Sequence, residues 1–239
     1  GGGGSNGIYL LSGSTIQTTS GNITLNGQGQ ASGFNNLGMR IEGVGTAIIA
    51  NAGSITLNGI GGDNSSAQHG VVILNGSQIT STGTATITLT GTGGNTSGQG
   101  FQQGVRVFGG AAIRTVDGDI TFNGTGGTDA TGANLPGIYL NTAVESTGAG
   151  NIRRNGTGRL SSSQGYGIWV GTAGSITASG TGSVSLTGIG GTGTTDLSGI
   201  LLAGTVQSAI GAILLDGTGG LGTGANNPGV EINGGRIES

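Results

Sequence analysis

The sequence predicts an all-β, single-stranded parallel β-helix, a solenoid of about 32 residues per coil with three strands in each coil. The first observation is a glycine that opens an alternating apolar phrase every 30 to 34 residues, at Gly7, Gly38, Gly70, Gly104, Gly137, Gly167, Gly199 and Gly229. The second is a phrase of the type GNITLNG, first seen at residues 21–27, that recurs in each interval. We therefore expect residues 1–239 to form one β-solenoid of seven full repeats and a partial one, a fragment of a longer array.

Each repeat contains three short segments in which apolar and polar residues alternate, which is the pattern of strands. In the first repeat these segments centre on Ile8, Ile16 and Ile23. Because successive side chains of a strand point to opposite faces, the apolar residues share one side, the interior of the coil. One expected interior column consists of Leu25, Leu57, Leu89, Phe122, Leu186 and Leu215.

Charged residues at three positions depend on this register. Arg154 falls in the interior column of the fifth repeat, so we expect a bulge or twist that turns its side chain toward solvent or a carboxylate. Arg114 and Glu145 follow interior residues of the second strand in successive coils. We expect these two side chains to face outward one rung apart and to pair.

A polar column comes directly after the third strand. It consists of Asn26, Asn58, Thr90, Asn123, Asn155, Thr187 and Asp216. Asn side chains stacked on one another can form amide ladders, and Asn tolerates left-handed turns. We interpret the column as a structural ladder and not as a binding site; if buried, it would also fix the stacking register.

The composition limits the possible functions. The chain has 59 glycines, but they keep a period, and charged residues make up only 7%, which is unlike a disordered chain. The seven basic residues are all arginines and the net charge is −3, so we expect no nucleic-acid partner. No apolar run approaches the roughly 20 residues that span a bilayer, so we expect no membrane insertion. The absence of cysteine is compatible with export without disulfides.

Two glycine-rich loops resemble the calcium-binding loops of β-rolls. Asp63 in GIGGDNSSA and Asp129 in GTGGTDATG follow glycines as in calcium-binding β-rolls. However, the spacing does not recur every nine residues, and one carboxylate per loop supplies few hard oxygen ligands. Calcium dependence stays open, and we expect no other metal and no cofactor, because the chain has no cysteine and one histidine, His69, in a loop without an evident partner.

Some parallel β-helices cleave acidic polysaccharides with clustered charged side chains, so closely spaced carboxylates are candidate catalysts. The tightest pair is Asp117 and Asp119, at the start of a third strand. Acid–base catalysis at a glycosidic bond needs two carboxyl groups that converge on it. We interpret this pair as solvated residues near Arg153 of the next coil, and we expect no enzymatic activity.

The outward positions of the first strand are candidates for binding. Arg106, Tyr139 and Trp169 occupy the same position in consecutive coils, and Tyr166 lies beside them at the end of a loop. Contacts between such planar groups each contribute about 0.5 to 1.5 kcal/mol, and an exposed aromatic stripe suits sugar rings or a partner protein. The alternative is that the variable loop folds over these residues and buries them.

An ice-binding face is another alternative. Thr24, Thr56, Thr88 and Thr121 align on the outward side of the third strand, where rows of threonine could order water. Arg153 interrupts this row in the next coil. Threonine is also a common residue on the solvated face of a strand.

The recurring GNITLNG and GIYL phrases resemble the glycine-rich strand repeats of large bacterial surface proteins, including filamentous-haemagglutinin-like exoproteins and giant cyanobacterial cell-surface proteins. The resemblance covers the whole chain but lies in repeat style. It implies a secreted, right-handed β-helical shaft that displays adhesive surfaces or builds an extracellular fibre at the bacterial surface. Expected partners are further repeats of the same chain, other copies of it, glycans or a cell surface. The alternative is a carbohydrate-active or ice-binding β-helix.

Overall fold

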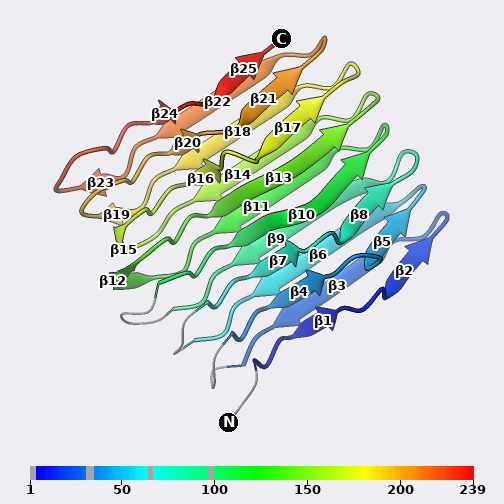
Figure 1. The fold of residues 1–239 in the computed structure, drawn as a ribbon, viewed down its shortest axis with the longest axis horizontal. Coiled ribbons are helices and arrows are strands. Elements are labelled where there is room, and N and C mark those ends of the chain that lie inside the picture. The colour runs from blue at the N-terminus through cyan, green and yellow to red at the C-terminus, as the bar shows by residue number, and fades with distance from the viewer. Residues whose placement is uncertain (1–3, 31–34, 64–66, 96–99) are drawn as a thin grey trace.

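The computed structural model describes residues 4–30, 35–63, 67–95 and 100–239, and it confirms the predicted β-solenoid. Within these ranges every regular element is a strand, and equivalent strands of successive coils pair in parallel (Figure 1). The coils stack from the N-terminal to the C-terminal end, with an offset of 32 residues between partners such as Asn26 and Asn58. The seven third strands form one sheet, so the stack contains about seven coils.

The strands fall into columns along the stack. The first-strand column comprises β1 (Ile8–Leu10), β4 (Met39–Glu42), β7 (Val71–Leu74), β16 (Ile168–Val170), β20 (Ile200–Leu202) and β24 (Val230–Ile232). The second comprises β2 (Thr15–Thr18), β5 (Ala47–Ala50), β8 (Gln78–Ser81), β17 (Ser175–Ala178), β21 (Thr205–Ser208) and β25 (Arg236–Glu238). β10 (Val105–Thr115) and β13 (Ile138–Ser146) run through both columns.

The remaining strands form the opposite sheet and the loop edge. The third-strand column comprises β3 (Ile23–Gln28), β6 (Ser54–Ile60), β9 (Thr86–Thr92), β11 (Ile120–Thr125), β14 (Ile152–Thr157), β18 (Val184–Ile189) and β22 (Ile213–Thr218). Short strands in the loops pair as β12 (Asp129–Ala133) with β15 (Ser161–Ser163) and β19 (Thr192–Gly193) with β23 (Leu221–Gly222).

The first and second strands belong to a single 14-stranded sheet, so the three strands of a coil contribute to two main sheets and not to three. The corner between the two strands explains the difference. In the first and third coils a positive φ at Gly13 and at Gly76 turns the chain. In the fourth and fifth coils the backbone stays paired on both sides of this corner, so β10 and β13 each run through both columns and join them.

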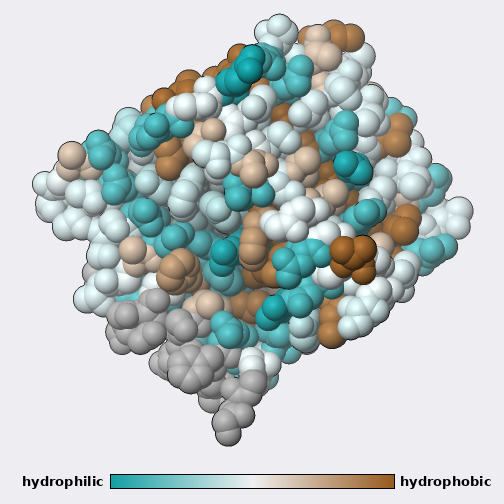
Figure 2. All heavy atoms as spheres, in the orientation of Figure 1, coloured by the Kyte–Doolittle hydropathy of each residue, from teal (hydrophilic) through white to brown (hydrophobic). Residues whose placement is uncertain are grey.

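The core lies between the 14-stranded and the 7-stranded sheet, where the alternating apolar side chains meet. The predicted interior column is confirmed, because Leu57, Leu89, Phe122 and Leu186 are fully buried. Leu57, Leu89 and Phe122 pair in register, and Leu186 follows Phe122 two rungs later. Leu25 and Leu215, in the first and last third strands, are partly buried against the same cluster. On the face shown in Figure 2, hydrophobic residues appear only in scattered groups among polar and neutral ones.

The two sheets meet along one edge through glycines. A Cβ atom added to Gly59, near the end of β6, would lie 2.1 Å from the carbonyl oxygen of Gly70, which opens the next coil. The same contact recurs in every complete coil. We call these residues the glycine seam: Gly27 with Gly38, Gly59 with Gly70, Gly91 with Gly104, Gly124 with Gly137, Gly156 with Gly167, Gly188 with Gly199, and Gly217 with Gly229.

The expected bulge that would turn Arg154 outward is absent, so this prediction was wrong. β14 has no bulge, Arg154 pairs in register with Phe122 and Leu186, and its side chain is fully buried. None of its three guanidinium nitrogens has a hydrogen-bond partner. Its closest compensation is the ring of Phe122, whose centroid lies 3.6 Å from Cζ. Paired strands on both sides hold β14 in register, so turning this side chain outward would break two backbone ladders.

Arg114 and Glu145 confirm the alignment of the second strand. They are direct partners in the β10–β13 ladder, and Arg114 Nε lies 3.3 Å from a carboxylate oxygen of Glu145. Because Arg114 is exposed and Glu145 is partly exposed, the pair contributes only about 0 to 1 kcal/mol. The free energy of unfolding of the charge-swapped variant Arg114→Glu/Glu145→Arg, measured by chemical denaturation, should therefore lie within about 1 kcal/mol of that of the parent. A larger loss of stability would mean that the pair contributes more than an exposed ion pair normally does.

Candidate functional site

The predicted stripe exists as a line of contacting side chains across three coils. Arg106 of β10 pairs with Tyr139 of β13, which pairs with Trp169 of β16. The guanidinium carbon of Arg106 lies 5.7 Å from the Tyr139 ring centroid, and the Tyr139 and Trp169 centroids are 4.8 Å apart. The two rings meet at 65°, edge to face, so they form a stepped surface and not a parallel stack.

Tyr166 lies beside the stripe, as expected, but its side chain is buried and packs against Trp169. It is only 6% exposed, and its ring contacts Trp169 at a centroid distance of 5.6 Å. Burial, followed by the charges of Asp196 and Glu231, raises the pKa of Tyr166 to about 12, so the phenol is neutral at physiological pH. Tyr139, Trp169 and Arg106 remain partly exposed, so the stripe is neither fully open nor covered.

His69 has partners that the sequence did not indicate. The loop before β7 lies against the next coil, where the backbone N–H of Gln103 donates to His69 Nδ1 at 3.2 Å. His69 Nε2 lies 3.3 Å from Nη1 of Arg106. The ring is almost completely buried, and burial, together with the charge of Arg106, lowers the pKa of His69 well below its usual value. The expectation of an isolated loop histidine was wrong, because contacts between loops of different coils leave no periodic signal.

The polar column after the third strand is aligned along the whole stack. Two amide steps are hydrogen-bonded: Asn58 Nδ2 donates to Asn26 Oδ1 at 2.8 Å, and Asn155 Nδ2 donates to Asn123 Oδ1 at 2.9 Å. Backbone pairing places Thr90, Thr187 and Asp216 in the same column. The column faces outward and is exposed or partly exposed, so it is not the buried ladder that would fix the register from inside.

The acidic pair is bound to the neighbouring coil. Asp119 accepts hydrogen bonds from the backbone and side chain of Asn151 and forms an ion pair with Arg153. Partial burial alone would raise the pKa of Asp119, but these hydrogen bonds and the charge of Arg153 lower it. Asp117 accepts from the backbone N–H of Ala149. The two carboxylates thus join coils and do not converge on an open space.

The two loop aspartates of the calcium-like phrases are also used locally. Asp129 accepts from the backbone N–H groups of Gly100 and Gly132, and Asp63 accepts from that of Asn95. Residues 64–66 of the phrase that contains Asp63 lie outside the described ranges. In the part of the chain that the structure describes, no three His, Asp or Glu side chains gather as a metal site would require.

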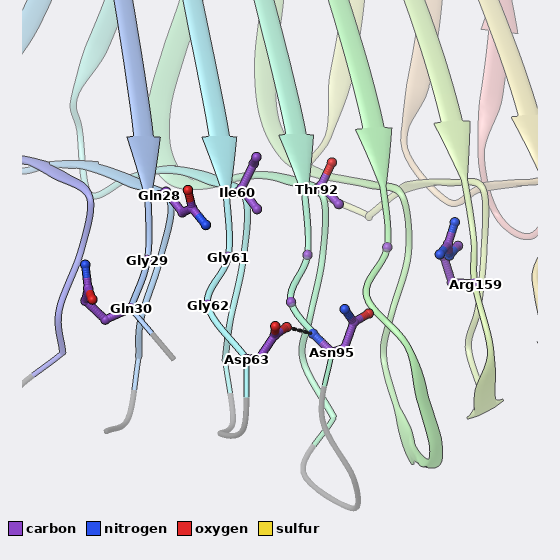
Figure 3. Close-up of a pocket in the computed structure, with 13 residues that line it drawn as sticks. Gln28, Gly29, Gln30, Ile60, Gly61, Gly62, Asp63, Thr92, Asn95 and Arg159 are labelled. Carbon is purple, nitrogen blue, oxygen red and sulfur yellow. Dashed lines mark hydrogen bonds between the residues drawn. The ribbon is translucent and has the colours of Figure 1, made fainter. Parts of the chain in front are cut away.

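A polar groove of about 520 Å³ crosses several coils beside the ends of the third strands (Figure 3). Its floor contains backbone glycines of the GxGG phrases, and Arg159 lies at one end. Gln28, Ile60 and Thr92 occupy one position on three successive coils, and Asp63 bonded to Asn95 lies below them. The sequence signals this groove only through the repeated glycines.

The outward threonines of the third strand are aligned as expected. Thr24, Thr56, Thr88 and Thr121 are consecutive partners, and Arg153 is the next residue in the row. The threonine row therefore extends over four rungs.

Comparison with known proteins adds no relative. No family model matches the chain, and no curated protein or solved structure matches it either. Within the described ranges, no helix has the length and apolar character needed to cross a bilayer.

Proposed function

We propose that this chain is part of a non-catalytic, structural and adhesive rod at a bacterial surface or in a secreted fibre. The observation that carries the proposal is a uniform stack of coils whose side-chain variation is displayed outward on successive rungs, as in Arg106, Tyr139 and Trp169. A solenoid of this kind gives length and an extended surface at the same time. The resemblance of its repeats to those of bacterial surface proteins motivates the extracellular location.

The edge of the stack at β22 offers a pairing surface to a partner made of similar repeats. The outer edge of β22 has no partner strand among the described residues. Beside it lies a hollow of about 620 Å³, lined by Ile213, Leu215 and Ile237 among others. A further third strand with the same alternation would fill this hollow and extend both the ladder and the core. Another copy of the chain is the partner that we propose for this edge.

The competing functions have less support. A polysaccharide-cleaving enzyme needs converging carboxyl groups, whereas Asp117 and Asp119 are bound to the next coil. An ice-binding face would rest on the four threonines, but the row then meets the charged side chain of Arg153. The stripe of Arg106, Tyr139 and Trp169 therefore remains our candidate for attachment.

Removing the rings of the stripe should weaken attachment without unfolding the rod. In the double variant Tyr139→Ser/Trp169→Ser the interior columns are untouched, so we expect a cooperative unfolding transition like that of the parent. Loss of two ring contacts of about 0.5 to 1.5 kcal/mol each should raise the dissociation constant for a glycan or a second rod about tenfold. Glycan arrays and filament-assembly assays measure this.

The matched control is Thr56→Ser/Thr88→Ser, which changes two outward residues on the opposite sheet. It should bind like the parent. If the ring-deleted variant also binds like the parent, the stripe only packs against its loop, and attachment must be sought elsewhere on the rod.

A further inference from the structure

A small crevice lies at the end of the stripe, on the outward side of β7. It has a volume of about 170 Å³. Val72 and Leu74 line it and belong to a small apolar cluster with Leu37 and Phe108. β7 lies between β4 and β10, and Val72 pairs with Arg40 on one side and with Arg106 on the other. An apolar floor thus separates two guanidinium groups that stand two rungs apart.

Hydrogen-bond donors of His69 and Arg106 at this crevice have no acceptor. Because His69 Nδ1 accepts from Gln103, the neutral ring must carry its proton on Nε2. This N–H faces Arg106 Nη1 at 3.3 Å, and a guanidinium nitrogen can only donate. Arg106 Nε is buried and also has no partner. Donors on two side chains therefore converge where an acceptor is missing, and buried donors normally have one.

The two arginines differ in their charge compensation. Arg40 is paired with Glu42 on its own strand. No carboxylate among the described residues lies within ion-pair distance of Arg106. The orientation of Arg106 is nevertheless restrained, because its guanidinium lies 4.2 Å from the Phe108 ring centroid and 5.7 Å from that of Tyr139. A fixed, uncompensated guanidinium suits an anion with two oxygens.

We propose that this crevice binds the carboxylate of an acidic sugar in a polysaccharide. The carboxylate accepts from Arg106 and from His69 Nε2–H, and the sugar ring lies at the mouth of the crevice, with Tyr139 and Trp169 continuing the surface along the stack. A peptide strand is a poorer occupant, because β7 is already paired on both edges and offers no free ladder. The proposal rests on the adhesive function above, whose ligand class it names.

Titration calorimetry with a defined oligogalacturonate tests the crevice directly. The parent should bind the acidic oligomer at least tenfold more tightly than the same oligomer with every carboxylate methyl-esterified. Arg106→Gln should weaken binding of the acidic oligomer about tenfold or more, because it removes the charge-assisted hydrogen bonds. Arg106→Lys keeps the charge but loses the planar fork, so it should fall between the two. Thermal unfolding checks that each variant is folded.

Arg114→Gln is the matched control, because Arg114 lies on the same strand but points outward in the second column and pairs with Glu145. It should bind like the parent. Three results would overturn the proposal: no binding of the acidic oligomer at millimolar concentration, equal binding of the esterified oligomer, or equal weakening by Arg114→Gln and Arg106→Gln. Inorganic phosphate that competes as well as galacturonate would reduce the crevice to a general anion site, contrary to the proposal.

The same measurements separate this proposal from the proposed function. If Tyr139→Ser/Trp169→Ser leaves attachment unchanged while Arg106→Gln abolishes galacturonate binding, the crevice stands and the stripe fails. If the reverse holds, the rod is adhesive through its rings, and its ligand is not an acidic sugar held by Arg106.

Discussion

Replacing Arg154 by Met should stabilise the protein by about 2 to 4 kcal/mol, because the substitution removes a buried charge from the core and keeps much of the side-chain volume. Arg154 has no hydrogen-bond partner for any guanidinium nitrogen, and only the Phe122 ring compensates the charge. For a chain of this length the midpoint of thermal unfolding should rise by on the order of 10 °C. Thermal and chemical denaturation of the parent and of Arg154→Met measure the difference.

The gain should depend on pH in one direction. Burial lowers the pKa of Arg154 from its usual value to about 9 in the folded protein. The folded state therefore binds fewer protons than the unfolded state between these two values, and the stability of the parent rises with pH across this interval. The advantage of Arg154→Met should be constant below about pH 8 and shrink above pH 9.

The adjacent Arg153 provides the control. It is exposed and pairs with Asp119, so Arg153→Met should change stability by about 1 kcal/mol or less. A parent that matches Arg154→Met in stability at neutral pH would mean that the guanidinium finds partners in solution.

Replacing Leu89 by Asp should destabilise the protein by several kcal/mol. Leu89 is fully buried between Leu57 and Phe122 in the interior column, and the new carboxylate would find no counter-charge there. We expect local or global loss of the stack, measured as a lower thermal midpoint and weaker protection of β9 amides from hydrogen exchange. The control Thr88→Asp, one residue earlier on the outward face, should stay within about 1 kcal/mol of the parent. Equal stability of both variants would contradict the register.

The repeat pattern of the sequence was sufficient to predict the coils, the interior columns and the alignment of outward residues. Glycines and alternation specify these features in each coil, and stacking repeats them, as the pairing of Arg106 with Tyr139 and Trp169 illustrates. The number of sheets was not predictable in the same way, because it depends on a corner conformation that changes between coils, as β13 shows.

The two errors at single residues have physical reasons. The rule that a charge avoids the core competes at Arg154 with a backbone paired on both sides, and the backbone prevails. His69 and Arg106 are 37 residues apart and meet through the geometry of a loop, which no periodic pattern encodes. The crevice depends on this contact, so it could be recognised only from the structure.

The glycine seam limits how a gene that encodes such a solenoid can change. Any missense change in a glycine codon introduces a Cβ atom, and at the seam this atom would overlap a carbonyl oxygen about 2 Å away. Selection for folding must therefore remove nearly every such change, whereas codons for outward residues are free to drift. Accepted mutations are thereby concentrated on the outer surface, so the solenoid can change its surface chemistry coil by coil while its cross-section stays the same.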